Sequence, residues 1–133
     1  MSRTIAVTAL RDEHQSEALY SKLFDIYDQI RRERRIEVFG TLDFEVVRNI
    51  DSKSHRIAKL KGNRILVHVN AGGLPKSALR YIIAHEIAHT LTKRHTKRFW
   101  KIVEAIYPTF ETGQSLLMKH GSQILGGPKL VLD

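Results

Sequence analysis

Two histidines and one glutamate stand close together in the segment His-Glu-Ile-Ala-His at residues 85–89. On a helix, residues four apart lie on one face and one turn apart, so His85 and His89 have the spacing that two ligands of a tetrahedral zinc ion require. Glu86 falls on the flank of that face, where it could accept a proton. The spacing therefore predicts a metal site with a general base beside it.

His95 is the candidate for a third ligand. On an unbroken helix it would lie about 9 Å along the axis from His89, so the helix must end between the two residues. Thr90 and Thr92 are weak helix formers, which allows a turn that swings His95 back toward the metal. Three protein ligands leave a fourth position for water, and such an open position is typical of a catalytic zinc.

These residues predict a zinc-dependent hydrolase with Zn²⁺ as its cofactor. Zinc would lower the pKa of a bound water, Glu86 would accept the proton, and the hydroxide would attack a carbonyl polarised by the metal. Peptide hydrolysis is the natural reaction, by an endopeptidase rather than an exopeptidase. Two alternatives stay open: His85 and His89 could be hydrogen-bonded core residues, or the metal could be bound without catalysis. Burying them without partners would cost on the order of several kcal/mol, which favours a metal.

Further elements must position these residues. Apolar residues three and four apart predict a long helix over 12–35. Short β-branched and aromatic runs predict three antiparallel strands over 44–50, 56–60 and 64–69, with a hairpin turn at 61–63 and a loop at 71–74.

The metal-binding helix is expected to begin at Pro75, and a second helix is expected to begin after Thr96 and to stop before Pro108. A short helix is expected over 115–120, followed by a detached tail at 129–133.

Composition narrows the remaining possibilities. With 133 residues the chain is expected to form one domain, 1–133. It has no cysteine, so a metal site must be built from His, Asp or Glu. No run approaches the roughly 18 apolar residues of a membrane span, so we expect no membrane partner and a cytoplasmic protein.

The combined motif, His-Glu-Ile-Ala-His at 85–89 and His-Thr-Lys-Arg-Phe-Trp at 95–100, resembles the YgjP-type zinc metallopeptidases and their SprT and WLM relatives. The resemblance covers roughly residues 60–110. It implies an α+β, minimal zincin-like fold. Such a fold has a long N-terminal helix backing the metal helix, a small and mostly antiparallel sheet, and a C-terminal helical segment. It also implies that the strand at 65–70 is the sheet edge to which a substrate chain adds.

The resemblance leaves some roles open. Relatives usually carry a Trp-Gly-Ser-Cys-like segment where this chain has Ser-His-Arg-Ile-Ala-Lys-Leu-Lys-Gly at 54–62, so the substrate range is not transferred. His68 is expected to be structural or solvent-facing rather than a ligand. Tyr81, Tyr107 and His68 remain candidates for stabilising the transition state.

A formal net charge of +8 makes nucleic acid a possible partner. Basic residues cluster at 31–35 and again after the metal motif. SprT-like relatives act on proteins attached to DNA, so the domain's own basic surface could contact DNA. The competing function is a nucleic-acid-binding module with a structural metal, and the simplest reading of each cluster is a solvated helix face. The candidate nucleic-acid contacts are Arg94, Lys97, Arg98 and Lys101, with Lys93 beside them.

Overall fold

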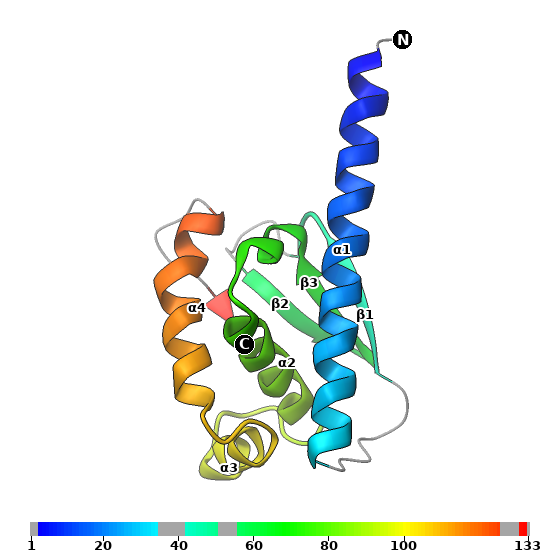
Figure 1. The fold of residues 1–133 in the computed structure, drawn as a ribbon. Helices are drawn as coiled ribbons and strands as arrows, with labels where there is room; N and C mark the ends of the chain where they lie inside the picture. The colour runs from blue at the N-terminus through cyan, green and yellow to red at the C-terminus, as the bar shows by residue number, and fades with distance from the viewer. Residues whose placement is uncertain (1–2, 35–41, 51–55, 126–130, 133) are drawn as a thin grey trace.

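The computed structural model describes residues 3–34, 42–50, 56–125 and 131–132. These residues form several helices and one small sheet (Figure 1). In chain order they are α1 (Arg3–Arg34), β1 (Asp43–Val47), β2 (Arg56–Lys61), β3 (Arg64–His68), the 3₁₀ helix η1 (Val69–Gly73), α2 (Lys76–His89), α3 (Lys97–Ile106), α4 (Phe110–Leu125) and β4 (Val131–Leu132). The expected α+β fold with a long N-terminal helix is confirmed.

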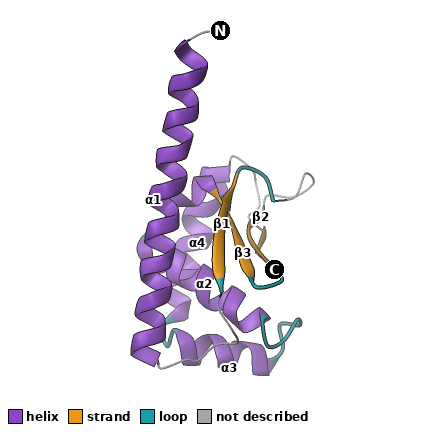
Figure 2. Cartoon of the chain, turned by 90° about the vertical axis from the view of Figure 1, so that its right-hand side faces the viewer, coloured by secondary structure: helices purple, strands orange, loops and turns teal. Residues whose placement is uncertain are grey.

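The first helix, α1, has 32 residues and begins nine residues before the predicted start at Asp12. Its first turns project beyond the rest of the molecule, whereas its second half packs on the core (Figures 1 and 2). That half carries the predicted apolar face, whose residues are at most 2% exposed: Leu19, Leu23, Ile26, Tyr27 and Ile30. The basic cluster at 31–35 extends past the described part of this helix.

The sheet is mixed, with strand order β1-β3-β2-β4. The hairpin of β2 and β3 is antiparallel as predicted, but β1 pairs with β3 in parallel, so the expectation of three antiparallel strands was wrong for β1. In the sheet, β3 lies between β1 and β2, so it is an inner strand. The prediction that the strand at 65–70 forms the sheet edge is therefore also wrong.

The residues Val131 and Leu132 form β4, which pairs in parallel with β2 opposite Arg56 and Ala58. The expectation of a detached tail at 129–133 was therefore wrong for these two residues. Because β4 is short, its pairing ends at Ala58. Among the described residues, no strand pairs with the outer side of β2 at Lys59–Lys61, which is the end nearest the hairpin turn.

The helices lie together on one side of the sheet (Figure 2). The strand face toward them contributes Phe44, Ala58, Ile65 and Val67 to the core, each at most 3% exposed. The central helix α2 contacts α1, α3, α4 and β2, and all of its residues from Ala78 to Ala88 except Arg80 are buried. A helix buried on all sides needs apolar residues all round, so any polar side chain it carries has a special role.

The last helices pack around α2. Thr96 caps α3 as predicted, because its Oγ1 accepts a hydrogen bond from the Phe99 N–H at 3.4 Å, and α3 ends at Ile106. The helix expected over 115–120 is present within the longer α4. At Gly113, α4 approaches α2 so closely that an added Cβ would overlap the Ser77 carbonyl and lie 2.8 Å from Tyr81 Cβ.

Candidate metal centre

The three predicted ligand residues come together at the end of α2. The Nε2 atom of His89 lies 3.2 Å from that of His85, and the Nε2 atom of His95 lies 3.4 Å from His85 and 3.2 Å from His89. Three nitrogens bound at about 2.0–2.1 Å to one tetrahedral zinc would lie roughly 3.3–3.4 Å apart. The spacing of the three imidazoles therefore fits a single metal ion.

The turn that returns His95 to the site contains Thr90 and Thr92, the two weak helix formers that predicted it. Helix α2 ends at His89, and Thr90 Oγ1 donates to the Ile87 carbonyl at 2.6 Å. The Thr92 N–H still bonds to the Ala88 carbonyl, after which the chain leaves the helix axis. The prediction that the helix ends between the second and third histidines is confirmed.

The outer nitrogens of two imidazoles have hydrogen-bond partners. His89 Nδ1 lies 3.1 Å from the Thr92 carbonyl oxygen. A carbonyl only accepts, so Nδ1 carries the proton and the Nε2 atom of neutral His89 presents a lone pair to the site. His85 Nδ1 lies 3.3 Å from the Tyr81 hydroxyl. Such outer bonds orient metal-binding histidines.

Two aromatic side chains back the cluster. The buried ring of Phe99 lies 4.9, 4.7 and 4.8 Å from the rings of His85, His89 and His95, and Trp100 stacks on His95 at 6.1 Å. The sequence analysis quoted both residues as part of the family motif but assigned them no role at the site. The signal was present in the Phe-Trp pair that follows His95 in the motif.

The predicted base, Glu86, is fully buried on the same helix. Its position is about 60° around the helix from His89, so both side chains point toward one flank of α2. A carboxylate in such an apolar helix is costly unless nearby positive charge or hydrogen bonds stabilise it. The burial of Glu86 on the helix that carries His85 and His89 is consistent with a cation at this site.

The protonation of His85 follows from its surroundings. Burial, together with the nearby His89 and His95, lowers the pKa of His85 from 6.5 to about 3. Its side chain is only 3% exposed. The imidazole is therefore neutral at ordinary pH, which is the form that binds metal.

Because of this pKa, the free energy of unfolding of the metal-free protein depends on pH in the acid range. Between pH 6.5 and about 3 the unfolded chain protonates His85 and the folded chain does not, so the free energy of unfolding falls as the pH falls. This residue contributes at most about 1.4 kcal/mol per pH unit. We expect urea titrations at several pH values to show that the free energy of unfolding of metal-free wild type falls more steeply with falling pH than that of His85→Gln. The glutamine side chain has no group that titrates in this range. Equal slopes would contradict the assignment.

A cleft of about 780 Å³ opens in front of the histidines. One wall is the turn between β2 and β3, with Leu60, Gly62 and Asn63. The other is the end of α2 and the turn after it, where His89, Thr90, Lys93 and His95 line the space. His85 is buried, His89 half-buried and His95 exposed, so the cluster opens toward this cleft.

None of the three candidates for transition-state stabilisation lines this cleft. Tyr81 is 2% exposed and sits behind His85, and burial raises its pKa to about 12, so it is a neutral phenol. Tyr107 is 8% exposed and packs under Arg80, whose guanidinium lies 5.4 Å from the ring centroid. His68 caps η1 by accepting from the Asn70 N–H at 3.0 Å, consistent with the structural role expected of it.

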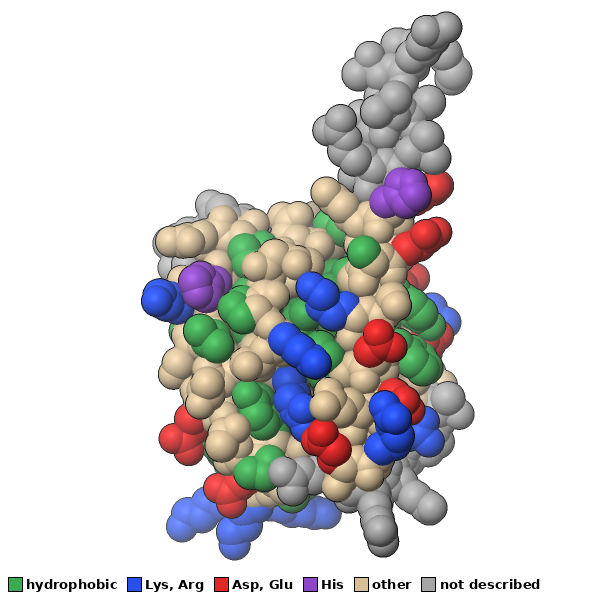
Figure 3. Space-filling view, viewed as in Figure 1, with side chains coloured by type: hydrophobic (Ala, Val, Ile, Leu, Met, Phe, Trp, Pro, Cys, Tyr) green, Lys and Arg blue, Asp and Glu red, His purple; other side chains and the backbone are tan. Residues whose placement is uncertain are grey.

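Lys and Arg side chains gather at the end of the molecule that contains α3 (Figure 3). The residues of this basic cluster, all exposed, are Lys93, Arg94, Lys97, Arg98 and Lys101. Lys93 also lines the cleft, so the cluster begins at the metal site and continues along α3. The sequence therefore identified a continuous basic surface, although not what binds there.

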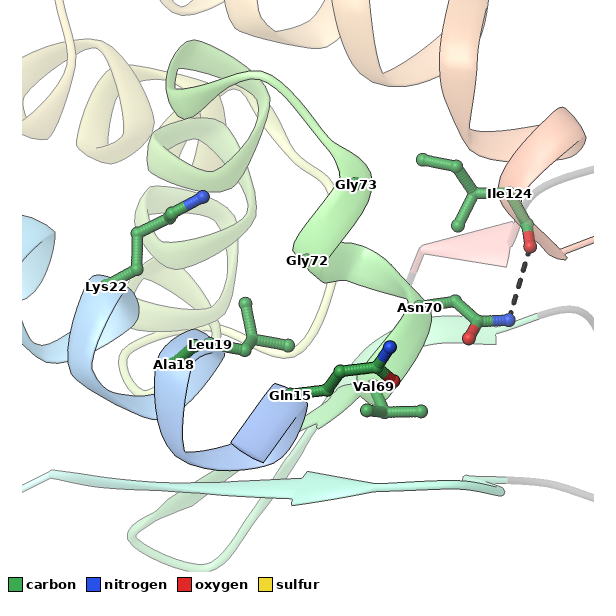
Figure 4. Close-up of a pocket in the computed structure, with 9 residues that line it drawn as sticks. All are labelled: Gln15, Ala18, Leu19, Lys22, Val69, Asn70, Gly72, Gly73 and Ile124. Atoms are coloured by element: carbon green, nitrogen blue, oxygen red, sulfur yellow. Dashed lines mark hydrogen bonds between the residues drawn. The ribbon is translucent and has the colours of Figure 1, made fainter. Parts of the chain in front are cut away.

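A second cavity, of about 530 Å³, lies between α1, η1 and the end of α4 (Figure 4). Its polar side chains Gln15, Lys22 and Asn70 are exposed. Asn70 Nδ2 donates to the Ile124 carbonyl at 3.2 Å and so joins η1 to α4. None of the three histidines of the metal cluster lines this cavity.

Comparisons with known proteins agree with the site. A family model for the YgjP-like metallopeptidase domain matches residues 53–120, just over half of the chain, and this span contains all three histidines. Comparison with curated proteins and with solved structures gave no significant match. In the part of the chain that the structure describes, no helix combines the length and apolarity needed to cross a bilayer. The chain belongs to the YgjP-like metallopeptidase family.

Proposed function

We propose that this protein is a zinc-dependent endopeptidase in which His85, His89 and His95 hold the metal and Glu86 is the general base. The observation that carries the proposal is the mutual spacing of the three Nε2 atoms, 3.2–3.4 Å, because it fits three ligands of one tetrahedral zinc. Imidazole also suits copper, nickel and iron. Zinc is favoured because it is a Lewis acid that commonly takes tetrahedral histidine ligands and has no redox chemistry of its own.

Each group at the site has a separate role in the proposed reaction. When bound, zinc supplies an activated water and polarises the substrate carbonyl. The Glu86 carboxylate takes the proton of the attacking water and returns it to the leaving amine. The contacts of His85 Nδ1 with Tyr81 and of His89 Nδ1 with Thr92 hold both rings with Nε2 toward the metal position. Phe99 fixes the positions of the rings and keeps water from one side of the cluster.

The cleft supports an extended polypeptide as substrate. The end of β2 at Leu60 borders the cleft, and the backbone groups on the outer side of this strand end could pair with a substrate strand. This replaces β3 as the strand to which substrate adds. A chain bound in this way continues on both sides of the cleaved bond, which favours an endopeptidase. Unfolded proteins offer such segments.

The basic cluster supports DNA as a partner that brings substrates to the site. Lys93 and Arg94 lie beside the cleft, while Lys97, Arg98 and Lys101 continue the positive surface along α3. Phosphate contacts from these side chains would be weakened steeply by salt. Protein attached to DNA is therefore the favoured substrate among unfolded chains. A nucleic-acid-binding module with a structural metal remains the second candidate, supported by the same cluster.

The test is cleavage of an unfolded protein substrate by zinc-loaded and metal-free protein, each with and without double-stranded DNA. We expect about one zinc per chain, cleavage only by the loaded protein, and faster cleavage with DNA at low salt. Zinc binding without cleavage under any condition would support the binding module instead. Failure to bind zinc would contradict both.

A further inference from the structure

Tyr81 lies one helical turn before His85 and directly behind its ring. The Tyr81 hydroxyl oxygen is 3.3 Å from His85 Nδ1, and the two rings meet edge to face at 5.7 Å. Both side chains are at most 3% exposed, so water does not replace a lost partner easily. The same oxygen accepts a hydrogen bond from Gln114 Nε2 of α4 at 3.2 Å.

The position of Gln114 depends on the glycine before it. A Cβ at Gly113 would overlap the Ser77 carbonyl and would lie 2.8 Å from Tyr81 Cβ. Only the absence of a side chain lets α4 approach α2 so closely at this level. This close approach brings the Gln114 amide within hydrogen-bonding distance of the Tyr81 oxygen, 33 residues earlier in the chain.

We propose that Tyr81, held by Gln114, is a positioning residue that orients the His85 ring and keeps its proton on Nδ1. The proposal rests on the proposed zinc site. With the metal on Nε2, the neutral His85 imidazole must carry its proton on Nδ1 and donate it to the Tyr81 oxygen. The oxygen then accepts two hydrogen bonds, one from the imidazole and one from Gln114, which uses both of its lone pairs.

The expected effects differ between the two partners. Phenylalanine at position 81 would remove the hydroxyl that contacts His85 Nδ1, and it would let the ring rotate away from the metal. Loss of such an outer partner typically lowers metal affinity about 10–100-fold. Methionine at position 114 would remove only the support of Tyr81, so we expect a smaller effect of a few-fold. The double variant with Tyr81→Phe and Gln114→Met should have nearly the zinc affinity of Tyr81→Phe alone. The reason is that Gln114 acts through the hydroxyl oxygen that Tyr81→Phe has already removed.

The experiment measures zinc affinity by competition with a chromophoric chelator for wild type, Tyr81→Phe, Gln114→Met and the double variant. Tyr107→Phe is the matched control, because it removes a hydroxyl from a buried tyrosine that also packs at Gly113 but lies under Arg80. Visible absorption of the Co²⁺-loaded proteins reports the ligand geometry directly. Circular dichroism and thermal unfolding of the metal-free proteins show whether each variant is folded.

Weaker zinc binding and an altered Co²⁺ spectrum for folded Tyr81→Phe, with an unchanged Tyr107→Phe control, would support the positioning role. Wild-type affinity and spectrum in Tyr81→Phe would overturn it and leave Tyr81 as a packing residue. If that variant does not fold, Gln114→Met decides, because unchanged affinity and spectrum there would also overturn the role. A wild-type protein that binds no zinc would contradict the proposed function itself, which is a different result.

Discussion

Glu86→Gln is expected to bind zinc with nearly the affinity of wild type and to lose peptide cleavage by about 10²–10⁴-fold, the usual contribution of a general base. Glutamine has almost the same shape, so the fully buried position is filled without a cavity. The amide cannot take a proton from water, however. The measurement is the initial rate of cleavage of an unfolded protein by variants with equal zinc content.

Glu104→Gln is a suitable control for this variant. Glu104 is an exposed carboxylate on α3, so the same chemical change there should leave cleavage unchanged. If Glu86→Gln cleaved substrate at the wild-type rate, Glu86 would not be the base. If it lost zinc as well as activity, the carboxylate would be needed to hold the metal, and the kinetic result alone would be ambiguous.

His95→Ala should have the second large effect, on metal binding. Structural zinc sites with four ligands bind with about 10–16 kcal/mol, so one ligand accounts for roughly 3 kcal/mol, or on the order of 10²-fold in affinity. His95 is exposed in the turn after α2, so its loss should leave the metal-free fold nearly unchanged. Chelator competition gives the affinity, and the cleavage rate at limiting zinc should fall with it.

His14→Ala controls for the loss of an exposed histidine, because His14 lies on α1 outside the metal cluster. It should keep wild-type zinc affinity and cleavage. Unchanged zinc affinity in His95→Ala would show that the metal needs only the two histidines of α2 or takes a ligand from elsewhere. That result would remove the main support for the tetrahedral site.

The metal cluster could be predicted from the sequence because its geometry is local. Helical periodicity placed His85 and His89 on one face, and the weak helix formers after them indicated the turn that brings back His95. The partners behind the site were not predictable in this way. Gln114 is far from Tyr81 in the chain, and nothing in its local pattern marks it as a hydrogen-bond donor to the site.

The residue ranges of the three strands β1 to β3 were also predicted closely, but their order in the sheet was not. Alternating apolar residues fix which face of a strand is buried, and they say little about which strand lies beside it. In the sheet, β3 lies between β1 and β2 although it follows both of them in the chain. The pairing of Val131 and Leu132 with β2 was missed for a similar reason, since two residues after a Gly-Gly-Pro segment give no strand signal of their own.

The graded burial of the three histidines also affects how fast metal is gained and lost. His85 is anchored in the core on α2, whereas His95 is carried by a short exposed turn. Opening that turn costs far less than global unfolding, because its residues 90–96 are exposed or half-buried. The rate of zinc exchange would then follow the opening of this turn, so the ion can enter and leave a protein that stays folded.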